Sequence, residues 1–300
     1  MRVRKKSLPK SINVSNTNIQ FAIKNIFRRF GKKPLSDQMN RQEENNLSKW
    51  FEAYVQRFAD EDGRLPPMLK LKLDHSRRVA DNATDIGKDL GFGQEDARSA
   101  RMLGLFHDIG RFTQFADHQT LRDELSFNHG QRGAHIMEKC PALAACSDRD
   151  RRRIIAGIRH HNSANLPVGL EPDILEFVKL ARDADKLDIF FVLYSSWKNG
   201  DLQRNPDIML MVKLDGPINP LALDEIRRRQ TVSVANVKSL ADFFLLQLSW
   251  VYDLNFRPSY QRLIQRSAIE QIAEALPPSA EITEQISLAR EHANNCCRKK

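Results

Sequence analysis

Cysteine is scarce in this sequence, and long hydrophobic runs are absent. The chain has 300 residues and four cysteines, Cys140, Cys146, Cys296 and Cys297, with no C-x-x-C spacing. A chain of this length needs no disulfides to stabilise its core, and the spacing does not indicate a zinc site built from thiolates. We therefore expect a reducing, cytoplasmic compartment. No apolar run reaches about 18 residues, so we expect a soluble protein without a membrane-spanning helix.

Acidic residues are nearly missing from the first 40 positions. That segment has ten lysines and arginines and one acid, Asp37, whereas the whole chain has 47 basic and 38 acidic residues and a net charge of +9. The rest of the chain therefore carries equal numbers of both signs. Because the basic character belongs to the N-terminal segment alone, we expect no specific nucleic-acid binding by the body.

Residues 1–40 are predicted to be a basic, partly disordered segment. Residues 1–18 show no pattern that could hold a core, but apolar residues at helical spacing over 19–30 predict an amphipathic helix. Three roles stay open for this helix. It could dock on the domain, contact an anionic membrane surface or a partner, or act as an Arg-rich organellar presequence.

The body lacks the apolar–polar alternation of half-buried strands and has no internal repeat. Helical spacing of apolar residues recurs instead, and it predicts helices over 47–58, 67–90, 97–107, from 129 onward, 154–161, 174–192 and 239–252. An irregular segment is expected between Gly110 and Ser126. The sequence thus predicts an all-α fold, with a core over 41–200 and a C-terminal helical extension over 201–300 packed on it.

Five separate helical segments each place a histidine or an aspartate on their inward face. These residues are His75, His107, His129, His161 and Asp185, and Asp108 directly follows His107. Burying imidazole and carboxylate groups costs free energy unless they are paired. One shared divalent cation would satisfy them all. The donor set contains no thiolate, and it favours manganese, iron, nickel, cobalt or zinc at a site that does chemistry.

The order of these motifs resembles the HD superfamily of metal-dependent phosphohydrolases. The sequence has a first histidine, then His-Asp-Ile-Gly at 107–110, then an aspartate directly before Lys-Leu, and the resemblance covers residues 47–200. It implies an HD-domain helical bundle with additional C-terminal helices. It also implies two metal ions, one of them bound by His75, His107, Asp108 and Asp185.

Members of the superfamily with two metals add histidines between the pair and the last aspartate. His129 and the His160-His161 pair occupy those places here. Helical phase favours His161, while His160 stays open as a ligand or a phosphate contact. The resemblance therefore implies that Asp108 bridges to a second metal, which is held by His129 and His161.

The implied activity is hydrolysis of a phosphate ester or anhydride in a nucleotide or another phosphorylated small molecule. Metals supply a hydroxide near neutral pH and stabilise charge on phosphoryl oxygens. Arg111 stands where two-metal relatives commonly have lysine, and it either reaches a phosphate or forms a surface ion pair. Asp183 and Lys186 are candidates for a proton donor and a phosphate contact, or for an intrahelical salt bridge.

Two other functions stay open from the sequence. Some HD-fold proteins use the same four histidines and two aspartates for a di-iron oxygenase centre. A regulatory HD protein tethered by its basic N-terminal helix is the other alternative. No Gly-Tyr-Pro sequence follows the histidine pair, because Asn162–Pro167 stands there instead, which argues against the cyclic di-GMP branch. The substrate, the metal and the oligomeric state stay open.

Overall fold

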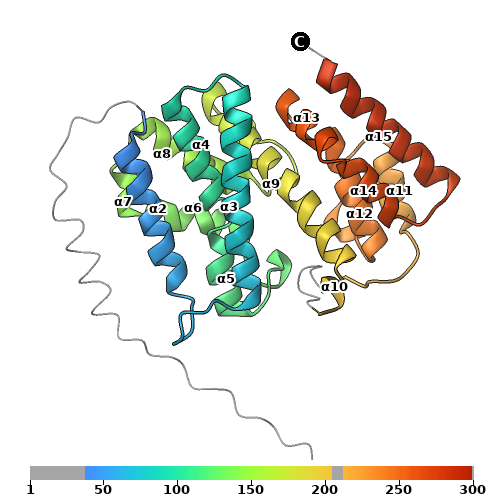
Figure 1. Cartoon of the computed structure of the whole chain (residues 1–300), viewed down its shortest axis with the longest axis horizontal. Coiled ribbons are helices and arrows are strands. Elements are labelled where there is room, and N and C mark those ends of the chain that lie inside the picture. The colour runs from blue at the N-terminus through green and yellow to red at the C-terminus, as the bar shows by residue number, and fades with distance from the viewer. Residues whose placement is uncertain (1–37, 205–211, 299–300) are drawn as a thin grey trace, which may run out of the picture. The chain divides into compact units, whose positions relative to one another are not determined.

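Helices make up most of the described chain (Figure 1). The computed structural model describes residues 38–204 and 212–298, and within these ranges it contains no strand, only an isolated bridge between Lys213 and Ser239. The predicted all-α fold is confirmed. No helix in these ranges is long and apolar enough to cross a membrane.

Residues 36–300 form one compact unit. The division of this unit into a core and an extension near residue 200 stays a prediction. The amphipathic helix expected over 19–30 lies outside the described residues.

The first three helices of the described residues are α2 (Arg41–Gln56), α3 (Pro67–Asp89) and α4 (Gln94–Phe106). A capping box between Asn40 and Glu43 starts α2 by satisfying backbone N–H groups that lack partners inside the helix. The ring of Phe51 on α2 packs edge-on against Phe106 at the end of α4, with centroids 5.4 Å apart. This contact anchors the end of α4, where the His-Asp pair follows.

A glycine allows α3 and α4 to cross closely. A Cβ atom on Gly104 would lie 2.7 Å from the Cα atom and 2.8 Å from the amide nitrogen of Ala80 on α3. Backbone atoms cannot give way as a flexible side chain can. A residue without a side chain is therefore needed one turn before His107.

The prediction of an irregular segment after Gly110 is wrong for the first part of that segment, because α5 (Gly110–His118) begins at this glycine. A Cβ atom on Gly110 would lie 2.2 Å from the carbonyl oxygen of His129. The glycine is thus required by the close approach of two helix starts, and it does not end a helix. A short 3-10 turn, η1 (Asp123–Leu125), follows α5.

Three further helices complete the surroundings of the histidines. They are α6 (His129–Glu138), the short α7 (Pro141–Ala144) and α8 (Asp148–His160). Ser147 caps α8 by accepting a hydrogen bond from the backbone N–H of Asp150 at 3.1 Å. α8 runs from this cap toward His161.

The long helix α9 (Pro172–Lys198) contacts α3, α4 and α8 as well as helices later in the chain. Buried residues occur around most of its circumference, as expected for a helix packed on several sides. The helices after it are α10 (Asp201–Arg204), α11 (Pro220–Arg227), α12 (Leu240–Ser249), α13 (Arg257–Gln265), α14 (Ala268–Ala275) and α15 (Ala280–Arg298), with 3-10 turns η3 (Val234–Asn236) and η4 (Trp250–Tyr252). α13 and α14 pack directly on α9.

Candidate metal centre

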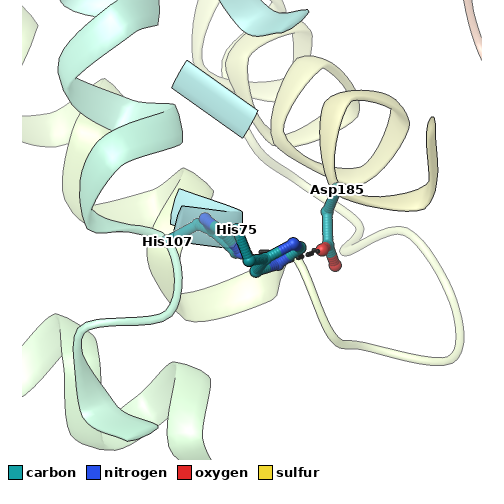
Figure 2. A group of neighbouring side chains, drawn as sticks. All are labelled: His75, His107 and Asp185. Carbon is teal, nitrogen blue, oxygen red and sulfur yellow. Dashed lines mark hydrogen bonds and ion pairs between the residues drawn. The ribbon is translucent and has the colours of Figure 1, made fainter. Parts of the chain in front are cut away.

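Three side chains from three helices converge to make a first group, consisting of His75, His107 and Asp185 (Figure 2). His75 lies on α3, His107 follows α4 directly, and Asp185 lies on α9. The Nε2 atoms of the two histidines are 3.1 Å apart. One carboxylate oxygen of Asp185 lies 3.1 Å from Nε2 of His75 and 3.5 Å from Nε2 of His107. Three electron-pair donors therefore point at a common position.

A second group consists of His129 and His161. His129 is the first residue of α6, and His161 caps the C-terminal end of α8. Their Nε2 atoms are 3.0 Å apart, so the arrangement of the first pair of imidazoles is repeated. The two histidines of each pair are also separated by the same 32 positions in the chain.

The carboxylate of Asp108 lies between the two groups and gives one oxygen to each. Its Oδ2 atom is 3.6 Å from Nε2 of both His75 and His107. Its Oδ1 atom is 3.3 Å from Nε2 of His129 and 3.7 Å from Nε2 of His161. His107, Asp108 and His161 also lie close enough to share a single ion, so the two groups adjoin at this carboxylate.

The Nδ1 atom of every one of these rings faces an acceptor. In His75 and His129 the acceptor is the carboxylate of Asp188 and Asp123, at 2.6 and 2.8 Å. In His107 and His161 it is the backbone carbonyl three residues earlier, at 2.7 and 2.8 Å. Carbonyl and carboxylate oxygens only accept, so each Nδ1 carries the proton and each Nε2 presents a lone pair to the centre.

This donor set fits divalent cations. Two nitrogens bound at right angles about 2.1 Å from one ion would lie about 3.0 Å apart, which is close to both observed separations. Outer partners that fix the tautomer of a metal-binding histidine are a regular feature of such sites. Imidazole nitrogens and carboxylate oxygens without thiolates suit iron, manganese, nickel, cobalt or zinc. These residues could therefore hold a divalent metal.

The pKa values of His75 and His129 are shifted by their surroundings. Burial and then the Arg111 guanidinium lower the pKa of His129 to about 3, so this ring is neutral near pH 7. Burial and Lys72 act to lower the pKa of His75, but the carboxylates of Asp185 and Asp188 outweigh them and raise it. The pKa values of the two histidines that face outer carboxylates therefore shift in opposite directions.

The two aspartates in the centre are held as carboxylates. Burial alone would raise their pKa values. Lys72 and His107 nevertheless hold the pKa of Asp108 well below its usual range. The contacts with His107 and His75 lower the pKa of Asp185 in the same way. Both side chains therefore present anionic oxygens near neutral pH.

Arg111, on the first turn of α5, lies beside the second group. Its Nη1 atom donates to Oε1 of Gln114 at 2.7 Å, to Oδ1 of Asp123 at 2.9 Å and to the carbonyl oxygen of Leu121. Its Nε atom is 3.5 Å from Oδ1 of Asp108 but makes no hydrogen bond and is buried. These contacts tie the guanidinium mainly to the 119–128 segment.

The other sequence-predicted residues lie outside the two groups. His160 is half-buried, and it is His161 whose ring reaches His129. Burial and Arg159 lower the pKa of His160. Asp183 accepts hydrogen bonds from the backbone N–H groups of Asn255 and Phe256, each at 3.0 Å.

Lys186 also turns toward the segment before α13. Its ammonium forms an ion pair with Asp253, which also pairs with Arg182 at 2.7 Å. Burial, followed by Arg182, lowers the pKa of Lys186. In the described structure Asp183 and Lys186 therefore join α9 to residues 253–256.

Sequence reasoning missed three residues that contact the centre. Lys72 lies 2.7 Å from Oδ2 of Asp108. It stands three positions before His75 on α3, and this spacing on one helix face could have revealed it. Asp188 follows Asp185 by three positions and could have been found in the same way. Asp123 lies in the short turn η1, where no helical phase points to its partner.

Comparison with known families supports this geometry. Residues 73–189 match the family model of the HD domain, a range that begins just before His75 and ends just after Asp188. Searches of curated proteins and of solved structures found no match. The matched range contains both groups and Asp108. Residues 73–189 of the chain are therefore an HD domain.

Proposed function

We propose that this protein is a metal-dependent phosphohydrolase with a binuclear site. His75, His107, Asp108 and Asp185 would hold one ion, and His129, His161 and Asp108 the other. HD domains typically belong to metal-dependent hydrolases, which supports the general class. The phosphoryl substrate and the second ion are the proposed parts.

The observation that carries this proposal is the division of the Asp108 carboxylate between two pairs of imidazoles. Each oxygen lies within 3.3–3.7 Å of the Nε2 atoms of one pair. A single ion would leave the lone pairs of the other imidazoles facing one another without a partner. Two ions bridged by Asp108 would satisfy all four rings.

The charges beside Asp108 support an anionic substrate. The Lys72 ammonium lies on the Oδ2 side and the Arg111 guanidinium on the Oδ1 side, with side chains 16% and 13% exposed. Ions bound by Asp108 would compete with both cations for its oxygens. Lys72 would then be free to bind a phosphoryl oxygen, while Arg111 stays engaged with Gln114 and Asp123.

Divalent ions in these groups would lower the pKa of water and offset negative charge that develops on a phosphoryl oxygen. The protein residues supply the arrangement. Gly104 and Gly110 allow the helices to approach, and the outer acceptors hold each ring in one tautomer. Lys72 supplies positive charge beside the buried carboxylate of Asp108.

Metal quantification on the purified protein, followed by a turnover screen, tests the proposal. Phosphate monoesters, diesters and nucleotides would be incubated with manganese, iron or nickel, and phosphate release or diester cleavage measured. Asp108→Ala serves as the blank and should lose activity on any substrate found. Well under one equivalent of metal per chain, unchanged by His107→Ala, would contradict the proposal.

The same screen separates the two other functions. Turnover that requires dioxygen and depends on the iron oxidation state would identify an oxygenase. Full metal loading without turnover of any compound would favour the regulatory alternative. The cations beside Asp108 support an anionic ligand, and they are the reason to screen phosphorylated compounds first.

A further inference from the structure

The outer carboxylates of the two groups are held in different ways. Asp188 accepts from Nδ1 of His75, lies on the 27-residue helix α9 and forms a two-point ion pair with Arg78 at 2.7 and 3.0 Å. Asp123 accepts from Nδ1 of His129 but lies in the three-residue turn η1. The first group is thus supported by a long helix, and the second by a connecting segment.

The carboxylate of Asp123 makes polar contacts with four surrounding side chains. Its Oδ1 atom accepts from Nη1 of Arg111 and from Nε2 of Gln114, both at 2.9 Å. Its Oδ2 atom is 2.8 Å from Nδ1 of His129 and accepts from Nδ2 of Asn162 at 3.3 Å. One side chain therefore joins α5, the start of α6 and the loop after α8.

Gln114 extends this set of contacts into the backbone of the same segment. It is fully buried, and its amide donates to Oγ of Ser126 at 2.8 Å and to the carbonyl oxygen of Phe127 at 3.1 Å. Arg111 adds a hydrogen bond to the carbonyl oxygen of Leu121. The position of Asp123 is thus set by the fold of residues 121–127, which have only one short turn of regular structure.

We propose that Asp123 is a positioning residue for His129, and that residues 119–128 thereby control metal occupancy of the second group while leaving the first group unaffected. This proposal rests on the proposed function, because it takes a metal as the ligand of both groups. It also assigns Arg111 a role different from phosphate binding. Arg111 would hold Asp123 in place and so act on the metal through His129.

The numbers of donor atoms in the two groups also predict weaker metal binding by the second group. The first group offers two imidazoles, the carboxylate of Asp185 and one oxygen of Asp108. The second offers two imidazoles and the other oxygen of Asp108. With one anionic donor fewer, the second group should bind its ion more weakly. Loss of an outer partner typically weakens metal affinity about 10–100-fold, which would empty the second group at metal concentrations that still fill the first.

Manganese titration of the full-length protein, with bound metal measured after equilibrium dialysis, tests this proposal. The wild type should bind two equivalents of manganese. Asp123→Asn should keep the affinity of the first group and bind the ion of the second group about 10–100-fold more weakly. Asp188→Asn should instead weaken binding by the first group. The matched control is Asp117→Asn, which makes the same chemical change at an exposed position of α5 and should titrate like the wild type.

Electron paramagnetic resonance provides a second readout that does not depend on activity. Two neighbouring manganese ions give a spin-coupled signal, and one isolated ion gives a six-line signal. At a metal concentration that saturates only the tighter group of Asp123→Asn, we expect the isolated signal where the wild type gives the coupled one. Asp123→Glu keeps the acceptor and should restore part of the coupled signal, which a general loss of folding would not allow.

The outcomes separate this proposal from the proposed function. If Asp123→Asn binds two equivalents with wild-type affinities, the positioning role is overturned and the binuclear phosphohydrolase still stands. If the wild type itself binds less than one equivalent, the proposed function fails. Arg111→Met supplies a further check. It should lower occupancy of the second group if Arg111 holds Asp123, but would raise only KM if Arg111 bound the phosphate of the substrate.

Discussion

The Nε2 atoms of His129 and His161 face each other at 3.0 Å, although the Nδ1 atom of each ring already faces an acceptor. The low pKa of His129 keeps its Nε2 atom unprotonated near pH 7, so this atom cannot donate to His161. Two opposed lone pairs at this distance repel unless a cation lies between or beside them. A divalent cation bound beside both nitrogens would remove this repulsion, which supports the proposed second ion.

The adjacent residues His160 and His161 provide a matched pair of variants. His161→Ala should lower bound metal by about one equivalent, because it removes one of the two imidazoles of the second group. His160→Ala should leave metal content unchanged, since its ring lies outside both groups. Elemental analysis of the two purified variants measures the difference. The reverse pattern would show that His160 is the ligand.

Removing the metal should lower the melting temperature. An ion that binds only the folded state adds about 2.7 kcal/mol at a free concentration 100 times its dissociation constant. For a domain of this size each kcal/mol shifts the melting temperature by roughly 2–4 °C, so saturation should raise it by several degrees. Thermal melts of chelator-treated protein, with and without added manganese, measure this shift. Asp108→Ala should respond much less.

Gly110→Ala should destabilise the fold and disturb the second group. Its Cβ atom would lie 2.2 Å from the carbonyl oxygen of His129 and 2.9 Å from the amide nitrogen of Gly133. Overpacking of this kind typically costs about 1–3 kcal/mol. Denaturant unfolding gives the change in free energy, and metal analysis reports on His129.

A matched control exists for this glycine. Gly93 precedes α4, and a Cβ atom there would meet nothing closer than a carboxylate oxygen of Glu95 at 3.6 Å. Gly93→Ala should cost at most about 1 kcal/mol, because alanine is a poorer N-cap than glycine but meets no close contact here. Equal losses in the two variants would show that the close approach at Gly110 is unimportant.

Stability should fall at alkaline pH because of the buried thiols. Burial raises the pKa of Cys140 from 9.0 to about 12, and it raises that of Cys146 in the same direction. Between pH 9 and 12 the unfolded chain loses these protons while the folded chain keeps them, so the free energy of unfolding decreases as pH rises. Urea unfolding at several pH values above 8 measures the slope, and Cys140→Ala should reduce it.

Thiol labelling checks the same burial independently. At pH 8 a thiol reagent should modify the half-buried Cys296 and Cys297 in the folded protein, and Cys140 and Cys146 only after unfolding. Four reactive thiols in the folded state would contradict this expectation.

Helical phase was enough to predict much of the fold and the inward-facing polar residues. Each of His75, His161 and Asp185 lies on a regular helix or at its cap, among apolar residues spaced by three or four. Such residues share a face by geometry alone. The predicted helix starts at Pro67 and His129 agree with the structure for the same reason.

Contacts that depend on irregular backbone could not be predicted in this way. Asp123 reaches His129 from a three-residue turn, and no periodicity connects the two. The partner of Asp183 lies some 70 positions later, at Asn255. Glycine often follows a helix end, whereas the reason for Gly110 is its close approach to His129, a neighbour that is distant in sequence.

Helix α9 presents Asp185 to the imidazoles and Arg182, Asp183 and Lys186 to residues 253–256. Successive residues of a helix differ by about 100° around its axis. Inserting or deleting one residue between Asp183 and Asp185 would therefore rotate Asp185 and Lys186 relative to Arg182 and Asp183, so these contacts could not all form at once. This stretch of α9 should therefore accept no change of length, and length differences among related chains should fall in the loops.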